Sequence, residues 1–272
     1  MDLYPSETEE AVRAASEEYL RDHVPVAEAR RRPPELWRAM AQMGWFGIAL
    51  PEDAGGVGLT LAAETLVFAE LGRYLAPVGA IAAAVAAGVA HRAGQPALAR
   101  EIAGGERRVA LGLPQADGRV RALDAAGADC LTVVTETGGA IHPVPDDWPV
   151  AACLDPTSSL AVVAMPDGLP LAADAGIRAA THQRIAAAAF ALGCGEAGRD
   201  MSSSYAQTRE QFGQPIGAFQ AVKHICADMA VRCSAARAQL LYAALAAGDA
   251  AANADGDARF QVAAAKKLAD AA

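Results

Sequence analysis

The sequence predicts a mainly α-helical protein with a small β-domain, in the order α, β, α. Hydrophobic residues make up 53% of the 272 residues but aromatic residues only 5%, so alanine supplies most of the apolar content. This composition favours closely packed helices over a β-sandwich, and the chain is long enough for a sizeable core. Helical patterns fill residues 1–105 and 181–272, whereas residues 106–180 carry short β-prone runs between Gly, Pro and Asp.

The N-terminal region is expected to contain several helices. Ser6 and Glu9 form a plausible capping box, because the hydroxyl and the carboxylate can each satisfy an orphan amide. A second helix is expected after Pro33-Pro34, with Gly44 at its end, and residues 51–60 form a glycine-rich loop. Further helices are predicted at "LAAETLVFAELGRYLAP" (61–77), "IAAAVAAGVAHRAG" (81–94) and "QPALAREIAGGE" (95–106).

The middle region has the sequence pattern of strands, and the C-terminal region has that of helices. Strands are predicted at "RRVALGLPQ" (107–115), "CLTVVTE" (130–136), "VAACLD" (150–155) and "LAVVAMP" (160–166). After residue 181 an apolar seam with steps of three and four predicts a helix bundle; it consists of Phe219, Val222, Cys226, Met229, Cys233, Ala236, Leu240 and Ala243.

The charge, the cysteine content and the hydropathy of the chain argue against several classes of protein. The formal charge is −9, and the only basic tract, Arg30–Arg32, resembles a solvated helix end, so nucleic acid is not an expected partner. Five cysteines without a C-x-x-C pair fit a reducing cytoplasm. The acidic start does not look like a signal peptide, and the apolar run 78–90 is too short to span a bilayer. We therefore expect a cytoplasmic protein that does not bind membranes.

Two further site classes are not supported by the sequence. Residues Gly193–Gly198 match G-x-G-x-x-G, but the preceding residues form helices, whereas a dinucleotide fingerprint needs a strand there. We interpret these small residues as helix-packing positions. The histidines are scattered without ligand spacing, so no metal site is predicted.

The segment "REQFGQPIGAFQ" (209–220) joins two helical stretches and carries an unusual set of side chains. Arg209 offers a fork suited to a diphosphate, and Gln211 and Gln220 can hydrogen-bond a ribose or a base. A phenylalanine can cover a planar ring. Alternatively, Arg209 caps the carbonyls of its own helix while Phe212 and Phe219 fill the core.

The ordered string around this segment resembles the acyl-CoA dehydrogenase family. "YAQTREQFGQPIGAFQAVKHICADMA" is similar to that family's helix-connecting motif in the C-terminal bundle. "LWRAMAQMGWFGIALPEDAGGVGLT" and "ETLVFAELGRYLAP" resemble its N-terminal domain. The resemblance implies an N-terminal helical domain (1–105), a middle β-domain (106–180) that is reduced here, and a C-terminal helix bundle (181–272).

In this family the corner binds the FAD of a neighbouring subunit across a dimer interface. By resemblance, Arg209, Glu210 and Gln211 line the diphosphate and ribose, Phe212 packs on the flavin nucleotide, and Phe219 and Gln220 meet the adenosine. Arg184 is assigned to the CoA side of the substrate. The implied partners are an acyl-CoA thioester, a homologous subunit in a dimer or α2β2 tetramer, and an electron-transfer flavoprotein.

The expected catalytic base is missing from its alternative family position. The family's reaction, α,β-desaturation, requires a carboxylate that removes the α-proton. In some branches it lies directly before the arginine equivalent to Arg184, where this chain has Gln183. In other branches the base lies beyond the position equivalent to residue 272. We therefore assign no catalytic residue to this chain.

Two explanations of this departure remain open. The chain ends at "AKKLADAA" without a helix stop signal, which indicates an incomplete record of a longer protein. Alternatively, it is the non-catalytic subunit of a heteromeric acyl-CoA dehydrogenase, like the paired subunits of actinobacterial steroid side-chain degradation. The reduced β-domain favours the second explanation. Other possibilities are an active homo-oligomeric enzyme, whose glutamate follows residue 272, and a structural partner without flavin.

Overall fold

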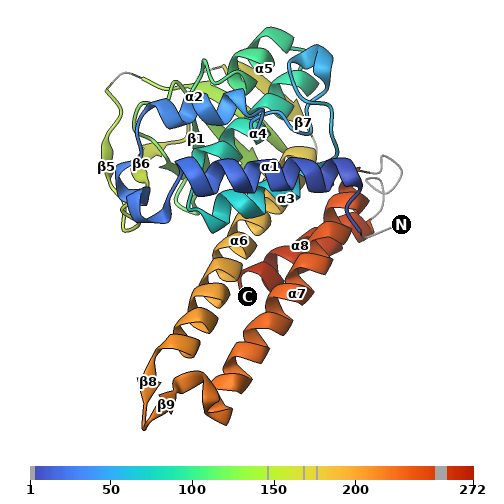
Figure 1. Ribbon diagram of the computed structural model, residues 1–272. Helices are drawn as coiled ribbons and strands as arrows, with labels where there is room; N and C mark the ends of the chain where they lie inside the picture. The colour runs from blue at the N-terminus through green and yellow to red at the C-terminus, as the bar shows by residue number, and fades with distance from the viewer. Residues whose placement is uncertain (1–3, 146, 168, 176, 249–255) are drawn as a thin grey trace.

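A computed structural model describes residues 4–145, 147–167, 169–175, 177–248 and 256–272. Helices flank a seven-stranded sheet, which confirms the mainly α fold class with a small β-domain (Figure 1). The division into domains at residues 105 and 180 stays a prediction. The N-terminal helical elements are α1 (Glu7–His23), η1 (Val26–Arg31), α2 (Glu35–Gln42), η2 (Glu52–Ala54), α3 (Leu61–Arg73), α4 (Gly79–Arg92) and α5 (Pro96–Ala103).

Local signals explain where these helices begin and end. The Ser6–Glu9 capping box is confirmed, with both reciprocal hydrogen bonds present at the start of α1. Thr60 caps α3 by accepting a hydrogen bond from the amide of Ala63 at 3.0 Å. Gly44 follows α2 with a φ of 75°, the left-handed conformation that favours glycine at a helix end.

The strands described for the middle region form one sheet in the order β5-β6-β2-β1-β3-β4-β7. β1 and β3 run parallel, and the other neighbouring strands are antiparallel. The four predicted strands are confirmed as β1, β3, β5 and β6, whereas β2, β4 and β7 were not predicted. The strands are β1 (Val109–Pro114), β2 (Arg119–Leu123), β3 (Cys130–Thr135), β4 (Gly138–Pro143), β5 (Val150–Ala152), β6 (Ser159–Ala164) and β7 (Ala172–Ala175).

The two faces of the sheet contribute to different clusters of buried residues. On β3, Cys130 and Val134 join the main core with the helices, whereas Leu131 and Val133 belong to a second cluster. This alternation follows from the two-residue period of a strand. Asp124, directly after β2, connects the sheet to α4, because its Oδ2 accepts a hydrogen bond from the amide of Gly79 at 2.5 Å.

The C-terminal region forms a helical arm that extends away from the sheet. In Figure 1, α6 and α7 run side by side away from the body, and α8 packs beside them near their upper ends. A small hairpin lies at the far tip. The elements of the arm are α6 (Arg178–Thr208), β8 (Glu210–Gln211), β9 (Gln214–Pro215), η3 (Ile216–Ala218), α7 (Gln220–Gly248) and α8 (Gly256–Ala269).

The glycines of the G-x-G-x-x-G match lie inside α6, so the rejection of a dinucleotide fingerprint is confirmed. Gly193 allows α6 to approach α3 closely, since a Cβ added there would lie 1.8 Å from the carbonyl oxygen of Ala69. The apolar seam of α7 is buried only in its second half. Cys233, Leu240 and Ala243 are buried, but the residues before Cys233 are half-buried or exposed.

The expectation of a solvated helix end holds for Arg30 and Arg31, which are exposed in the last turn of η1, but it is wrong for Arg32. Arg32 is only partly exposed, and its guanidinium donates hydrogen bonds to the carbonyl oxygens of Pro25 (2.9 Å) and Tyr74 (2.8 Å). The side chain therefore connects the η1 segment to the end of α3. Within the described residues, no helix is long and apolar enough to cross a membrane.

Candidate functional site

The predicted cofactor corner lies at the tip of the α6–α7 arm. Arg209 ends α6, and its carbonyl oxygen accepts a hydrogen bond from the amide of Ile216 at 2.7 Å. Strands β8 and β9 pair across the turn, with Gln211 opposite Gln214. Gly217 lets η3 pack on α6, because a Cβ there would lie 2.8 Å from the carbonyl oxygen of Ala206. The corner is therefore a compact turn with a defined backbone.

The hairpin loop holds an aromatic residue in an unfavourable conformation. Phe212 and Gly213 have φ values of 53° and 78°, the left-handed pair that a two-residue hairpin of type I′ requires. Asn and Gly usually occupy these positions, since a side chain such as that of Phe is strained there. The side chain of Phe212 is 93% exposed. Core filling by Phe212 is therefore the wrong interpretation of this residue.

The other predicted cofactor residues surround this loop. Phe219 is half-buried, and its ring meets that of Phe212 edge to face at 6.1 Å between centroids. Gln220 at the start of α7 lies 2.9 Å from the Nε2 atom of His224. The remaining three side chains are exposed, and they are those of Arg209, Glu210 and Gln211. The structure thus brings all six residues predicted for FAD binding to one corner.

Arg184 lies elsewhere. It follows Gln183 near the start of α6, and its guanidinium forms an ion pair with Glu136 at the end of β3. At 1.5 Å per residue, the 25 positions between Arg184 and Arg209 place their backbones about 37 Å apart along α6. Within one chain, the predicted CoA-side residue and the cofactor corner therefore do not form a common site.

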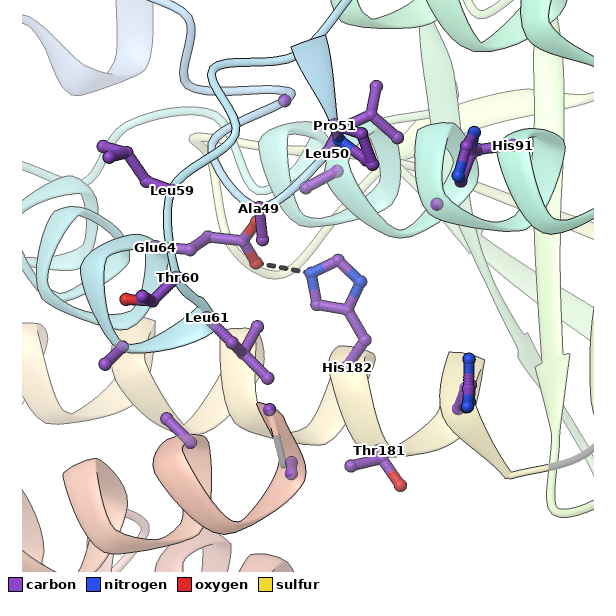
Figure 2. A pocket seen from close by; sticks show the side chains of 18 of the residues that line it. Ala49, Leu50, Pro51, Leu59, Thr60, Leu61, Glu64, His91, Thr181 and His182 are labelled. Atoms are coloured by element: carbon purple, nitrogen blue, oxygen red, sulfur yellow. Dashed lines mark hydrogen bonds and ion pairs between the residues drawn. The ribbon is translucent and has the colours of Figure 1, made fainter. Parts of the chain in front are cut away.

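Sequence reasoning did not find a cavity that lies between α3, α4, α6 and α7. Its volume is about 560 Å³, and Figure 2 shows two of its lining residues, Glu64 of α3 and His182 of α6, pointing toward each other and joined by a hydrogen bond. Nε2 of His182 contacts Oε1 of Glu64. Glu64 is buried, with 2% of its surface exposed. The two residues are separated by 118 positions, so no sequence pattern connects them.

The cavity has apolar walls and one basic end. Hydrophobic side chains from the loops before α3 and from the end of α7 form the walls, including Phe46, Leu50, Leu59 and Leu245. The basic residues His91 and Arg92 of α4 and Arg178 and His182 of α6 also line it, with Glu64 as the single carboxylate among the lining residues. Such a chamber suits an apolar body with an anionic group.

Two family models match the chain on either side of the middle region. The N-terminal domain of acyl-CoA dehydrogenases matches residues 6–105, and the C-terminal domain matches residues 174–272. By structure, the chain is similar to the ChsE4-ChsE5 complex from Mycobacterium tuberculosis. The TM-score is 0.77 with 26% identity, covering 98% of this chain and 84% of that chain.

Two curated relatives carry the name acyl-CoA dehydrogenase IpdE2. The protein from Mycobacterium tuberculosis is 36% identical over 223 residues, covering 78% of this chain and 66% of that protein. Two other relatives are matched over only 32% and 61% of their lengths. The IpdE2 protein from Mycolicibacterium smegmatis is 31% identical over 233 residues, covering 84% of this chain and 68% of that protein. The chain therefore belongs to the acyl-CoA dehydrogenase family.

Proposed function

We propose that this chain is a subunit of a flavin-dependent acyl-CoA dehydrogenase that desaturates a CoA thioester. In this proposal it works in a hetero-oligomer, either a dimer or an α2β2 tetramer, and contributes FAD-binding residues to a site on a homologous subunit. The structural relative ChsE4-ChsE5 is a complex of two named components, which supports a heteromeric assembly. An electron-transfer flavoprotein is the proposed electron acceptor.

The observation that carries the proposal is the exposure of the corner around Phe212. An aromatic ring that is 93% exposed on a strained turn contributes nothing to the core of its own chain. Within the described residues, the side chain of Arg209 also makes no hydrogen bond. A cation and an aromatic ring held outward on a defined turn fit a diphosphate and a planar ring that another subunit presents.

The length of α6 supports binding across an interface. The corner lies about 37 Å along this helix from Arg184, the residue proposed for the CoA side. A second subunit that packs along the arm would bring the corner of one chain to the substrate side of the other. The same arm exposes further apolar side chains, namely Met201 (70%), Tyr205 (58%), Ile225 (59%) and Val231 (68%).

The division of chemical roles follows from the residue types. Bound flavin supplies the acceptor for the β-hydride. Gln183 cannot remove the α-proton, because an amide is not a base at neutral pH, so we propose that the partner subunit provides the carboxylate. Arg209 is proposed to bind the negatively charged diphosphate of the cofactor. Arg184 is the residue of this chain proposed to orient the CoA thioester.

Two alternative functions predict a different flavin content of the purified protein. An active homo-oligomer, whose glutamate lies outside residues 1–272, would be yellow when the complete chain is purified alone. A structural subunit would remain without flavin in the presence of its partner. Under the present proposal, the visible flavin absorbance appears when the chain is co-expressed with a homologous acyl-CoA dehydrogenase subunit, and not when it is expressed alone.

Substitution of Arg209 in the co-expressed complex tests the corner itself. Arg209→Ala is expected to weaken FAD binding by roughly 1.5–3 kcal/mol, the scale of a charge-assisted hydrogen bond. Arg209→Lys should restore only part of this loss, since the planar fork is absent. Arg121→Ala, at an exposed position on β2, serves as the control. Unchanged FAD affinity in a folded Arg209→Ala complex would refute the assignment.

A further inference from the structure

We propose that the cavity between α3, α4, α6 and α7 binds an apolar carboxylate, in a site separate from the cofactor corner. The carboxylate would lie at the basic end, against Arg178, Arg92 and the start of α6. The hydrocarbon body would lie against the apolar walls described above. This ligand class is an amphipathic monoanion, such as a medium-chain acid.

The guanidinium of Arg92 is only partly used by the chain itself. Its Nε donates to Oδ2 of Asp174 at 2.5 Å, but Nη2 is buried and has no hydrogen-bond partner among the described residues. Because Nη2 is buried, a ligand in the cavity would reach this guanidinium through Nη1. Nη1 lies on the side of Gly88, 3.0 Å from where a Cβ of that residue would be.

Gly88 lies beside two basic side chains that line the cavity. The same Cβ position lies 3.7 Å from Nδ1 of His182, whose other ring nitrogen contacts Glu64. A methyl group at residue 88 would press on Arg92 Nη1, so glycine allows this guanidinium and the His182 ring to line the cavity side by side.

The two carboxylates closest to the basic end are engaged by residues other than Arg178. Glu64 is engaged by His182, and Asp174 by Arg92. Arg178, an exposed residue that also lines the cavity, has no ion pair within the described part of the chain. Its guanidinium therefore remains available to a ligand anion.

The start of α6 adds to the positive potential of this end. No side chain caps α6 at Ile177, and its first turn holds no acidic residue. The positive end of the helix dipole is therefore not offset by the chain's own first-turn side chains. Arg178 and Thr181 of this turn line the cavity, so the dipole acts on the same space as the arginines.

The site differs from both functional positions of the proposed dehydrogenase. His182 and Arg184 are two positions apart on α6, so their side chains leave the helix about 200° from each other. One contacts Glu64 of α3 and the other Glu136 beyond β3, on different sides of α6. Arg178 lies 31 positions before Arg209, or about 46 Å along the helix axis. Carboxylate binding therefore does not depend on FAD binding.

Calorimetric titration of the 272-residue chain with decanoate tests the site. We expect saturable one-to-one binding, no comparable binding of acetate, which lacks the apolar body, and none of decyltrimethylammonium, which carries the opposite charge. Arg178→Gln is expected to weaken decanoate binding roughly tenfold, on the scale of one charge-assisted contact. Arg121→Gln, at an exposed position distant from the cavity residues in sequence, should leave it unchanged.

Gly88→Ala separates binding from folding. Alanine favours the helix over glycine by about 1 kcal/mol, so the variant should fold at least as well as the parent chain. Its Cβ would lie 3.0 Å from Arg92 Nη1 and push the guanidinium out of position, so decanoate binding should fall by about tenfold or more. Equal binding of decanoate and decyltrimethylammonium would overturn the proposal. So would unchanged decanoate affinity in Arg178→Gln, or inorganic phosphate binding as tightly as decanoate.

Discussion

Glu196 of α6 accepts two hydrogen bonds from Arg237 of α7, at 2.9 Å from Nε to Oε1 and 2.5 Å from Nη2 to Oε2. Glu196 is 5% exposed, whereas the side chain of Arg237 is 32% exposed. Arg73 of α3 approaches the same carboxylate at 4.0 Å. This carboxylate therefore connects the N-terminal helices to both long helices of the arm.

Removal of Arg237 should lower the unfolding free energy more than removal of the charge on Glu196. Arg237→Ala leaves the buried Glu196 carboxylate without its two donors and should cost about 2–3 kcal/mol of unfolding free energy. Glu196→Gln leaves a partly solvated arginine and should cost about 1 kcal/mol. Urea unfolding measures both values. A larger loss in Glu196→Gln would contradict the burial argument.

Two glycines of α6 form a matched pair for testing helix packing. In Gly193→Ala the new Cβ would lie 1.8 Å from the Ala69 carbonyl oxygen, so α3 and α6 must separate. We expect a loss of more than about 2 kcal/mol. Gly198→Ala meets nothing within 4 Å and should gain up to about 1 kcal/mol from helix propensity. Similar midpoints of thermal unfolding for the two variants would show that the helices are not closely packed there.

Asp124 gives the stability of the fold a specific pH dependence. Burial raises the pKa of its carboxyl above the ordinary value of 3.8, despite hydrogen bonds from Gly79 and Ser158. The folded state therefore holds the proton more tightly than the unfolded state. This contribution to stability is fully present below pH 3.8 and is lost as the pH rises through the folded pKa.

Comparison with Asp124→Asn isolates this effect. The amide oxygen still accepts from Gly79, and asparagine tolerates the φ of 54° at this position. The unfolding free energy of the parent chain relative to Asp124→Asn should fall as the pH is raised through this window. A constant difference between pH 3 and pH 7, within roughly 0.3 kcal/mol, would show that burial does not perturb this carboxyl.

Phe212→Asn should separate stability from cofactor binding. Asn-Gly is the preferred sequence for the turn that Phe212-Gly213 forms, so the isolated chain should gain about 0.5–1 kcal/mol in thermal unfolding. The co-expressed complex should lose flavin, because the exposed ring is gone. Full flavin retention in the variant complex would argue against a role for Phe212 in the cofactor site.

The chain expressed alone is expected to reduce no artificial electron acceptor with any acyl-CoA. Gln183 occupies the alternative base position, and proton removal needs a carboxylate with a tuned pKa. Activity should appear with a partner subunit that carries the glutamate. Turnover by the isolated chain that disappears on substitution of one of its own carboxylates would place the active site elsewhere.

The sequence was sufficient to predict the helices and part of the sheet. The Ser6–Glu9 box and Gly44 act through local hydrogen bonds and backbone conformation, so residues nearby in sequence determine them. β4 and β7 were missed because "GGAIHP" and "AADA" contain few β-branched residues, and these strands form by pairing with β3 and with each other. Local preference does not report such pairing.

The cofactor corner and the cavity also differ in how far the sequence could predict them. The residues of the corner are contiguous in sequence, so a motif could group Arg209 with Phe212 before the structure placed them on one turn. Glu64 and His182 meet only because α3 packs on α6. An isolated glutamate in an apolar helix gave no sign of its partner, and the cavity was therefore not predicted.

The separation of the arm tip from the body has a consequence for mutational tolerance. The side chains from Arg209 to Pro215 are exposed, and η3 contains no buried residue, so their replacement removes little buried surface. A survey of substitutions scored by the abundance of the single chain should therefore classify this hairpin as permissive. The same survey scored on the flavin content of the assembled complex should classify it as intolerant, because selection at these positions would act on the pair of chains.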